Sequence, residues 1–294
     1  MTNEDRVITR RDFLRGAASA ALTAAVGLPV AAEAAAEKKS RVVLIRSAGV
    51  LDKDGKIDPN VLGDMLDQAV MKLLDKPSAV SAWKSLVKPS DLVGIKTNRW
   101  NRMPTPPELE KIIADRIVAA GIPTDRVFCE DRGLRDKFEA STALINVRPA
   151  RTHHWSGIGS CIKNYIIFAP KPSDLHPDSC AALGSVWSLP VVKGKTRLNI
   201  LVLLNPQFYG RGPQDFDPNN LWAYKGLAVS TDPVAVSAVG AHLLKAKRIA
   251  VFGEEKPLTP TTHIAAADEK YGLGVSDLNR IEIIKLGWKT DILI

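Results

Sequence analysis

The sequence predicts an α/β protein built on a mainly parallel sheet with helices on both faces. Short apolar runs of strand length alternate along the chain with longer segments whose apolar residues recur at helical spacing. Short loops that contain Gly and Pro separate these segments. Alternating strands and helices are typical of sheets whose parallel strands are joined by helical crossovers. The chain has 294 residues, of which 45% are hydrophobic, so a single α/β domain over residues 37–294 is expected.

Residues 1–36 are expected to be an export signal and not part of the fold. Arg10 and Arg11 precede Phe-Leu, an Ala-rich apolar segment follows at 16–30, and Ala-Glu-Ala at 32–34 offers a cleavage site. The paired arginines resemble the signal that directs folded proteins to the twin-arginine translocase. The alternatives are an N-terminal membrane anchor and a chance basic amphipathic segment, but the apolar run is too short for a good permanent span. A periplasmic protein with no stable membrane span after cleavage is therefore expected.

The first predicted elements are a strand at 41–46 and two helices. Pro59 begins an amphipathic helix whose apolar residues recur at helical spacing, and a second helix at 78–86 buries Trp83. Residues 52–58 have the composition of a calcium loop. However, Val50 and Val61 occupy the first and last ligand positions, where carboxylates are required. This segment is therefore predicted to be a turn.

Residues 92–132 are predicted to form a strand, a loop, a helix and a second strand. Lys96 follows the first strand directly, and Arg132 lies at the end of the second. In open α/β sheets, ligands bind beyond the carboxyl ends of the strands. Lys96 and Arg132 are therefore expected to converge on one anion, with Asn98 as a further ligand-binding residue. Solvated loop cations with surface partners are the alternative.

The second half of the chain continues the alternation of helices and strands. Asp232 and Pro233 form a strong helix start, because Asp caps well and Pro suits the first helical position. The long polar loop that precedes them is of a length that is usually functional or mobile. The remaining predicted elements are a helix to about 141, a strand at 144–147, a polar loop at 151–157, a helix at 158–168, a strand at 198–204, a loop at 205–220, helices at 233–247 and 263–271, and a strand at 281–284.

Charge and cysteine content limit the classes of partner. The formal charge is +8, but the basic residues are scattered, so an anionic small molecule is expected and nucleic acid is not. Cys129, Cys161 and Cys180 are too few and too far apart for a zinc ribbon or a four-thiolate iron–sulfur cluster. Buried free thiols are expected, with a disulfide between Cys161 and Cys180 as the alternative. The cofactor remains unknown, and a metal is left open.

Further candidate residues come from the polar segments of the second half. Lys163 with Asn164 would add a third cation to the anion site. His153 and His154 are neighbours whose side chains should point in different directions, and His154 is preferred as the proton-transferring residue. His154, His176 and His263 are the candidate metal ligands, although no pair has the His-x-x-x-His spacing.

These considerations give a candidate site with assigned roles. The helix start at Asp232 is most simply a cap, but its free backbone donors could also bind an anion. The expected catalytic residues are Lys96, His154 and Lys163, and the expected ligand-binding residues are Asn98, Arg132, Asn164 and Asp232.

Several motifs, in this order, resemble uncharacterised-domain family 362 (domain of unknown function 362). They are Val93–Asn98, Asp131-Arg132, His154-Trp155 with Lys163-Asn164, Ser230–Ala235 and Tyr271–Gly274. The resemblance covers about residues 41–285 and implies the exported branch of the family that lacks ferredoxin cysteines. The family has no agreed reaction. Asn205 and Ser237 stand where it usually has Asp, and Pro106 stands where His is common, which implies a lost or altered activity.

Two functions from different classes follow. The first is an exported enzyme that acts on an anionic small molecule in a Lys/Arg/His pocket, with a metal or redox cofactor loaded before export. The second is a non-catalytic exported binding protein for an anionic ligand, which the missing carboxylates favour.

Overall fold

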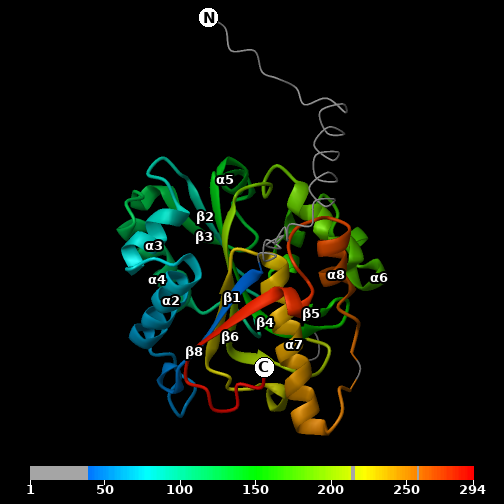
Figure 1. The fold of residues 1–294 in the computed structure, drawn as a ribbon. Helices are drawn as coiled ribbons and strands as arrows, with labels where there is room; N and C mark the ends of the chain where they lie inside the picture. The colour runs from blue at the N-terminus through cyan, green and yellow to red at the C-terminus, as the bar shows by residue number, and fades with distance from the viewer. Residues whose placement is uncertain (1–38, 213–215, 257) are drawn as a thin grey trace, which may run out of the picture. The chain divides into compact units, whose positions relative to one another are not determined.

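A computed structural model describes residues 39–212, 216–256 and 258–294. They form an eight-stranded sheet with helices on both sides, which confirms the predicted α/β fold (Figure 1). The predicted export signal at 1–36 lies outside the described residues. Among the described helices, none combines the length and the apolar character needed to cross a membrane.

The sheet is mixed but mostly parallel. Its order is β3-β2-β4-β6-β7-β1-β8, with β5 paired to β4. Strand β7 is antiparallel to both of its neighbours and β5 is antiparallel to β4, whereas the other four pairings are parallel. The strands are β1 (Ser40–Arg46), β2 (Val93–Lys96), β3 (Val127–Glu130), β4 (Ala143–His153), β5 (Gly157–Gly159), β6 (Thr196–Gln207), β7 (Gly226–Ser230) and β8 (Ile281–Gly287).

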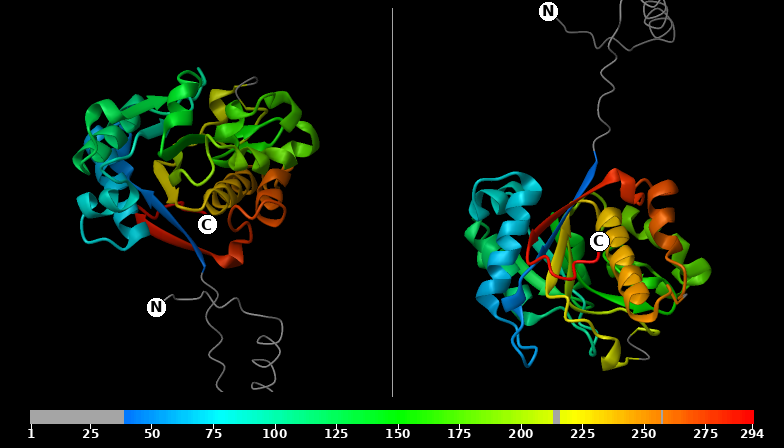
Figure 2. Two further views of the ribbon diagram at one scale, coloured as in Figure 1. Left: turned by 90° about the horizontal axis from the view of Figure 1, so that it is seen from above. Right: turned by 60° about the horizontal axis from the view of Figure 1, so that its bottom comes forward.

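Helices cover the two faces of the sheet and give three layers, which Figure 2 shows from two further directions. Alternate residues of a strand point to opposite faces. Val43 and Ile45 of β1 therefore pack with α2 (Pro59–Leu74), α3 (Ala79–Leu86) and α4 (Pro107–Ala119). Val42 and Leu44 pack with α7 (Pro233–Phe252) and α8 (Thr262–Glu269). The short helices α5 (Arg135–Ala140) and α6 (Pro177–Cys180) complete the described α-helices.

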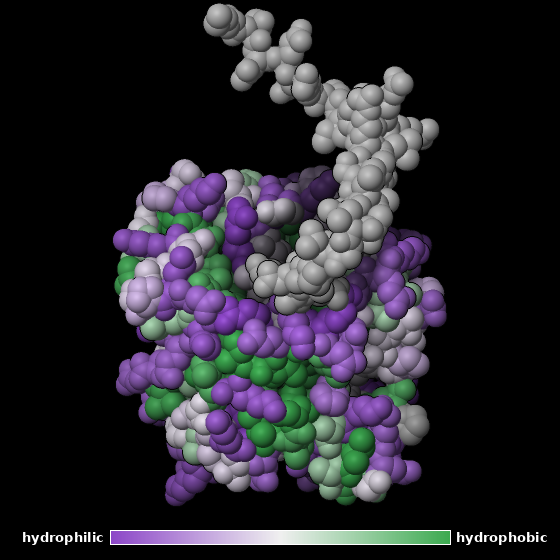
Figure 3. Space-filling model, in the orientation of Figure 1, coloured by the Kyte–Doolittle hydropathy of each residue, from purple (hydrophilic) through white to green (hydrophobic). Residues whose placement is uncertain are grey.

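The outer surface does not by itself indicate a site. The face seen in Figure 3 is hydrophilic around its edges and carries a hydrophobic area in its lower middle. Exposed apolar groups of this kind are normal on globular proteins. The buried polar groups are more informative about a site.

The structure corrects two predictions near the middle of the chain. Strand β4 runs to His153, so residues 151–153 are not in a loop. The predicted helix at 158–168 is wrong, because Gly157–Gly159 pairs with β4 as β5 and Ile162–Phe168 forms a 3₁₀ helix, η3. Gly157 has a φ of +71°, a conformation that glycine adopts without strain, and this allows the tight hairpin. Strand β7 was not predicted.

Candidate anion-binding site

A cavity of about 200 Å³ lies at the carboxyl ends of β2 and β3 and beside the last part of β4. Strand β2 ends at Lys96, which is opposite Asn146, whereas β4 continues to His153. The last residues of β4 therefore have no β2 neighbour on that side. Strands β3 and β4 follow β2 in sequence but pair on its two opposite edges, so the chain changes direction at this point. Ligands of α/β proteins bind at such positions.

Two arginines of β4, Arg148 and Arg151, line the cavity together. Residues three apart on a regular strand point to opposite faces. The pairing of β4 with β6 is irregular at this point, because Pro149 lies opposite Val202 and Arg151 lies opposite Gln207, so the extra residues belong to β6. Arg148 and Arg151 nevertheless both line the cavity. Both are buried, at 4% and 1% exposure.

Arg148 is the least satisfied charged group of the site. It makes no hydrogen bond or ion pair with any residue that the structure describes, and its Nε atom is fully shielded. Arg151 is better placed, because its Nη2 donates to Asn98 Oδ1 at 2.9 Å and its Nη1 to the Met103 carbonyl at 3.4 Å. Burying a charge without a partner is costly. The cavity therefore offers guanidinium donors that an anion would satisfy.

Lys163 on η3 adds a third buried cation. Its Nζ donates only to Cys180 Sγ, at 3.5 Å, which is a weak acceptor. Burial lowers the pKa of Lys163 to about 8, partly offset by Cys180, while Arg148 lowers it further. The ammonium therefore remains charged at neutral pH. Arg132 supplies a fourth cation at the rim, where its side chain is 61% exposed.

Lys96 supports the cavity from behind and does not line it. Its Nζ donates to Asp131 Oδ1 and to the Thr97 carbonyl, both at 2.8 Å. Burial lowers the pKa of Lys96 to about 8, although Asp131 raises it. Burial disfavours the Asp131 carboxylate, but the charge and hydrogen bond of Lys96 outweigh this and lower its pKa. The predicted direct contact of Lys96 with an anion is thus replaced by a role in holding Asp131.

Asp131 is the single acidic side chain among the described residues that line the cavity. Its second oxygen, Oδ2, accepts from the Arg99 amide at 2.9 Å. The four lining cations and Lys96 behind them face this one carboxylate. The positive charge of the site exceeds its negative charge, and the field in the cavity favours an anion.

Asn164 lines the cavity and ties β2, β4 and η3 together. Its Nδ2 donates to the Lys96 carbonyl, to Asn146 Oδ1 and to the Val147 carbonyl, at 2.8–3.1 Å. Three acceptors around one nitrogen fix the orientation of the amide, because only the NH₂ group can donate. The predicted ligand-binding residue is therefore also a structural clamp between two strands.

His153, and not the predicted His154, lines the cavity. Its Nδ1 accepts from the Trp155 amide at 3.3 Å, which leaves the proton on Nε2. Burial strongly lowers the pKa of His153, so the imidazole is neutral. The two imidazoles stack at 4.9 Å with an interplanar angle of 9°, so they do not diverge as expected. The reason is that β4 continues through His153 and the chain turns only at His154.

The structure does not bring the three predicted metal-ligand histidines together as a set. His176 lines the cavity, and both His176 and His154 contact the Trp155 ring, at 3.8 and 4.1 Å. His263 on α8 is buried elsewhere, with Nε2 3.3 Å from Ser160 Oγ. Within residues 39–294, apart from the gaps at 213–215 and 257, no group of three His, Cys, Asp or Glu side chains is placed to hold a metal ion.

Asp232 lies outside the cavity and caps α7. Its Oδ1 accepts from the Val234 and Ala235 amides, and its Oδ2 accepts from Ser40 Oγ and the Val275 amide. The carboxylate is thus saturated by protein donors, and the simpler of its two predicted roles is the one observed. The three cysteines are free thiols, so the alternative disulfide is not formed.

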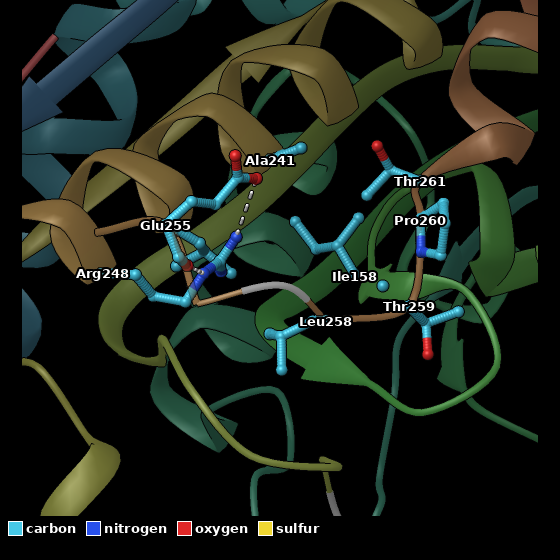
Figure 4. A pocket seen from close by; sticks show the side chains of 10 residues that line it. Ile158, Ala241, Arg248, Glu255, Leu258, Thr259, Pro260 and Thr261 are labelled. Carbon is cyan, nitrogen blue, oxygen red and sulfur yellow. Dashed lines mark hydrogen bonds and ion pairs between the residues drawn. The ribbon is translucent and has the colours of Figure 1, made fainter. Parts of the chain in front are cut away.

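A second cavity of about 390 Å³ lies between β5, α7 and the segment that leads to α8 (Figure 4). Its one arginine, Arg248, donates to the Glu255 and Phe208 carbonyls and faces the Glu255 carboxylate. Thr259 on its wall donates through Oγ1 to the His154 carbonyl. In the described part of the chain this cavity thus has no unpaired cation, and its wall supports the turn that follows His153.

Sequence reasoning missed Arg148 and did not assign a role to Arg151 or His153. Both arginines lie in a strand that also carries Asn146, Thr152 and His153, and polar residues in a central strand are a usable signal. Comparisons of the chain with protein-family models, with curated proteins and with solved structures found no match. The resemblance to family 362 therefore stays a prediction.

Proposed function

We propose that this protein is exported and binds a multiply charged anionic small molecule in the cavity beside β4. The observation that carries the proposal is Arg148, which is 4% exposed and has no partner among the described residues. Lys163 has only a thiol as partner, and one carboxylate, Asp131, faces all the cations. A bound anion would supply the missing charge-assisted hydrogen bonds.

The neutral state of His153 favours a role in binding the anion over a role in proton transfer. With its proton on Nε2, this imidazole can donate to an anion but offers no free lone pair to the cavity. An enzyme remains the second candidate, because His176 also lines the cavity. Burial lowers the pKa of His176 to about 4, with Lys163 acting in the same direction, so at neutral pH its imidazole is uncharged and has a free lone pair.

The test is titration calorimetry of the purified chain with phosphate, pyrophosphate and citrate at constant ionic strength. We expect saturable binding that Arg148→Met weakens at least tenfold, since a charged hydrogen-bonding group is lost. Lys111→Met is the matched control, because Lys111 is an exposed cation on α4 whose loss changes the net charge equally. Equal affinity of the Arg148 variant and the control would refute the proposal.

Turnover separates the two candidates. Binding without any change in the anion after prolonged incubation identifies a binding protein. Conversion of the anion that is lost in His176→Gln, with binding retained, identifies an enzyme.

A further inference from the structure

The cavity has two chemically different ends. Its deeply buried lining, the inner end, carries Arg148, Arg151 and Lys163, whereas its more exposed lining, the opening, is largely aromatic or apolar. The aromatic and apolar residues of the opening are Trp100, Trp155, Ile166, Ile167 and Pro172. A site that held only an inorganic anion would need no such opening. The combination points to a ligand with a charged head and a flat apolar body.

Trp155 is the most prominent residue at the opening. Its side chain is among the few large hydrophobic groups of the described chain that are exposed, at 41%. Its indole stacks on His176 with ring centres 3.8 Å apart and an interplanar angle of 24°. The Arg132 guanidinium, also in the lining of the cavity, lies 5.6 Å from the centre of the Trp100 ring. Aromatic and guanidinium planes of this kind stack on heteroaromatic rings.

The charge of the inner end favours a phosphate over a single carboxylate. Arg148, Arg151 and Lys163 approach from two separate segments and face one carboxylate, so a head group with one negative charge leaves positive charge uncompensated. A phosphate monoester carries close to two charges and presents three oxygens in different directions. The cavity volume, about 200 Å³, equals that of roughly seven water molecules in the liquid. It holds a phosphoryl group and its neighbouring atoms, and leaves a larger body at the opening.

We propose that the ligand is a mononucleotide-like phosphate monoester, with its phosphate on Arg148, Arg151 and Lys163 and its heteroaromatic ring against Trp155. This inference rests on the proposed function and names the ligand class of the same site. Arg132 and Trp100, which also line the cavity, contact the same ligand.

The test compares ligands that carry the two parts separately and together. Inorganic phosphate, ribose 5-phosphate, adenosine, adenosine 5′-monophosphate and flavin mononucleotide are titrated into the purified chain at constant ionic strength. We expect at least one of the two mononucleotides to bind about tenfold or more tightly than ribose 5-phosphate. Stacking of one base on an aromatic side chain adds enough binding free energy for a difference of this size. Arg148→Met should weaken every phosphate ligand.

Variants of Trp155 separate this inference from the proposed function. In Trp155→Leu, the affinity for the mononucleotide should fall to that for ribose 5-phosphate, with phosphate affinity unchanged. Trp222→Leu, at a half-buried tryptophan outside the cavity, is the control. Equal binding of ribose 5-phosphate and both mononucleotides refutes the ligand class while the anion site stands. If no anion binds, both proposals fail.

Discussion

Replacing Lys163 with methionine should make the unliganded protein more stable and its anion binding weaker. The Lys163 side chain is 3% exposed, and its ammonium has a single weak acceptor. Its pKa falls from 10.5 to about 8, chiefly because burial penalises the charge. A shift of this size corresponds to about 3 kcal/mol between the charged and neutral forms. Methionine has a similar length and carries no charge, so it removes this cost.

The expected gain in the free energy of unfolding is roughly 1–3 kcal/mol, as for other buried charges replaced by apolar residues. For a chain of this size, each kcal/mol corresponds to about 2–4 °C in the melting temperature. The assay is thermal unfolding at pH 7 with and without pyrophosphate. The variant should melt higher without the anion, and its anion-induced shift should be small.

The pH dependence of the stability checks independently that the charge of Lys163 destabilises the unliganded fold. The pKa of Lys163 is lower in the folded chain than in the unfolded chain, so the unfolded chain holds more protons between about pH 8 and 10.5. The stability of the wild-type chain should therefore rise relative to that of Lys163→Met over this range. Lys111→Met, at an exposed ion pair, should change little. A Lys163 variant that is less stable than wild type at pH 7 without the anion would falsify the reasoning.

Three further predictions concern the groups around the cavity. Anion affinity should fall as the pH rises through and above 8, because the ammonium of Lys163 loses its proton. Titration calorimetry between pH 7 and 9.5 measures this, and a constant affinity would contradict it. Asp131→Asn leaves the buried ammonium of Lys96 without a counter-ion. This should lower the free energy of unfolding, measured by urea titration, by roughly 3–5 kcal/mol. A loss under about 1 kcal/mol would show that the Lys96–Asp131 pair does not stabilise the fold. Gly157→Ala should weaken both stability and anion binding, because the added Cβ would lie 2.3 Å from the carbonyl oxygen of Thr259. Gly55 is the control: its φ is similarly positive, but the space around it is open. Gly55→Ala should therefore lower stability without affecting anion binding.

Much of the fold followed from the sequence, because periodicity reports which face of an element is buried. The apolar spacing in α2 and the cap at Asp232 are local features, and both elements form where predicted. The position of the site beyond β2 and β3 also follows from a general rule of parallel sheets. Strand β7 escaped prediction because a short fully buried strand has no alternation to detect.

The contents of the site were harder to predict, because they depend on tertiary pairing. Strict alternation places Arg148 and Arg151 on opposite faces, yet both line the cavity, at a point where the pairing of β4 with β6 is irregular. The choice between His153 and His154 depended on where β4 ends, and strand ends are set by the neighbouring strands. Lys96 was correctly placed in the sheet, but its ammonium pairs with Asp131 and is not part of the cavity lining.

The conflict between local rules and the observed structure is itself informative. Elsewhere in the described sheet, the central strands are mostly apolar, and Asn199 on β6 is hydrogen-bonded. Around the end of β4, shielded atoms without a partner occur on Thr97, Arg148, Arg151 and Asn164, which come from three separate segments. Such departures are costly in a chain that otherwise follows the rules of packing, and they tend to mark functional sites. A ligand that satisfied these groups would recover stability only when bound, so the anion should stabilise the fold as it binds.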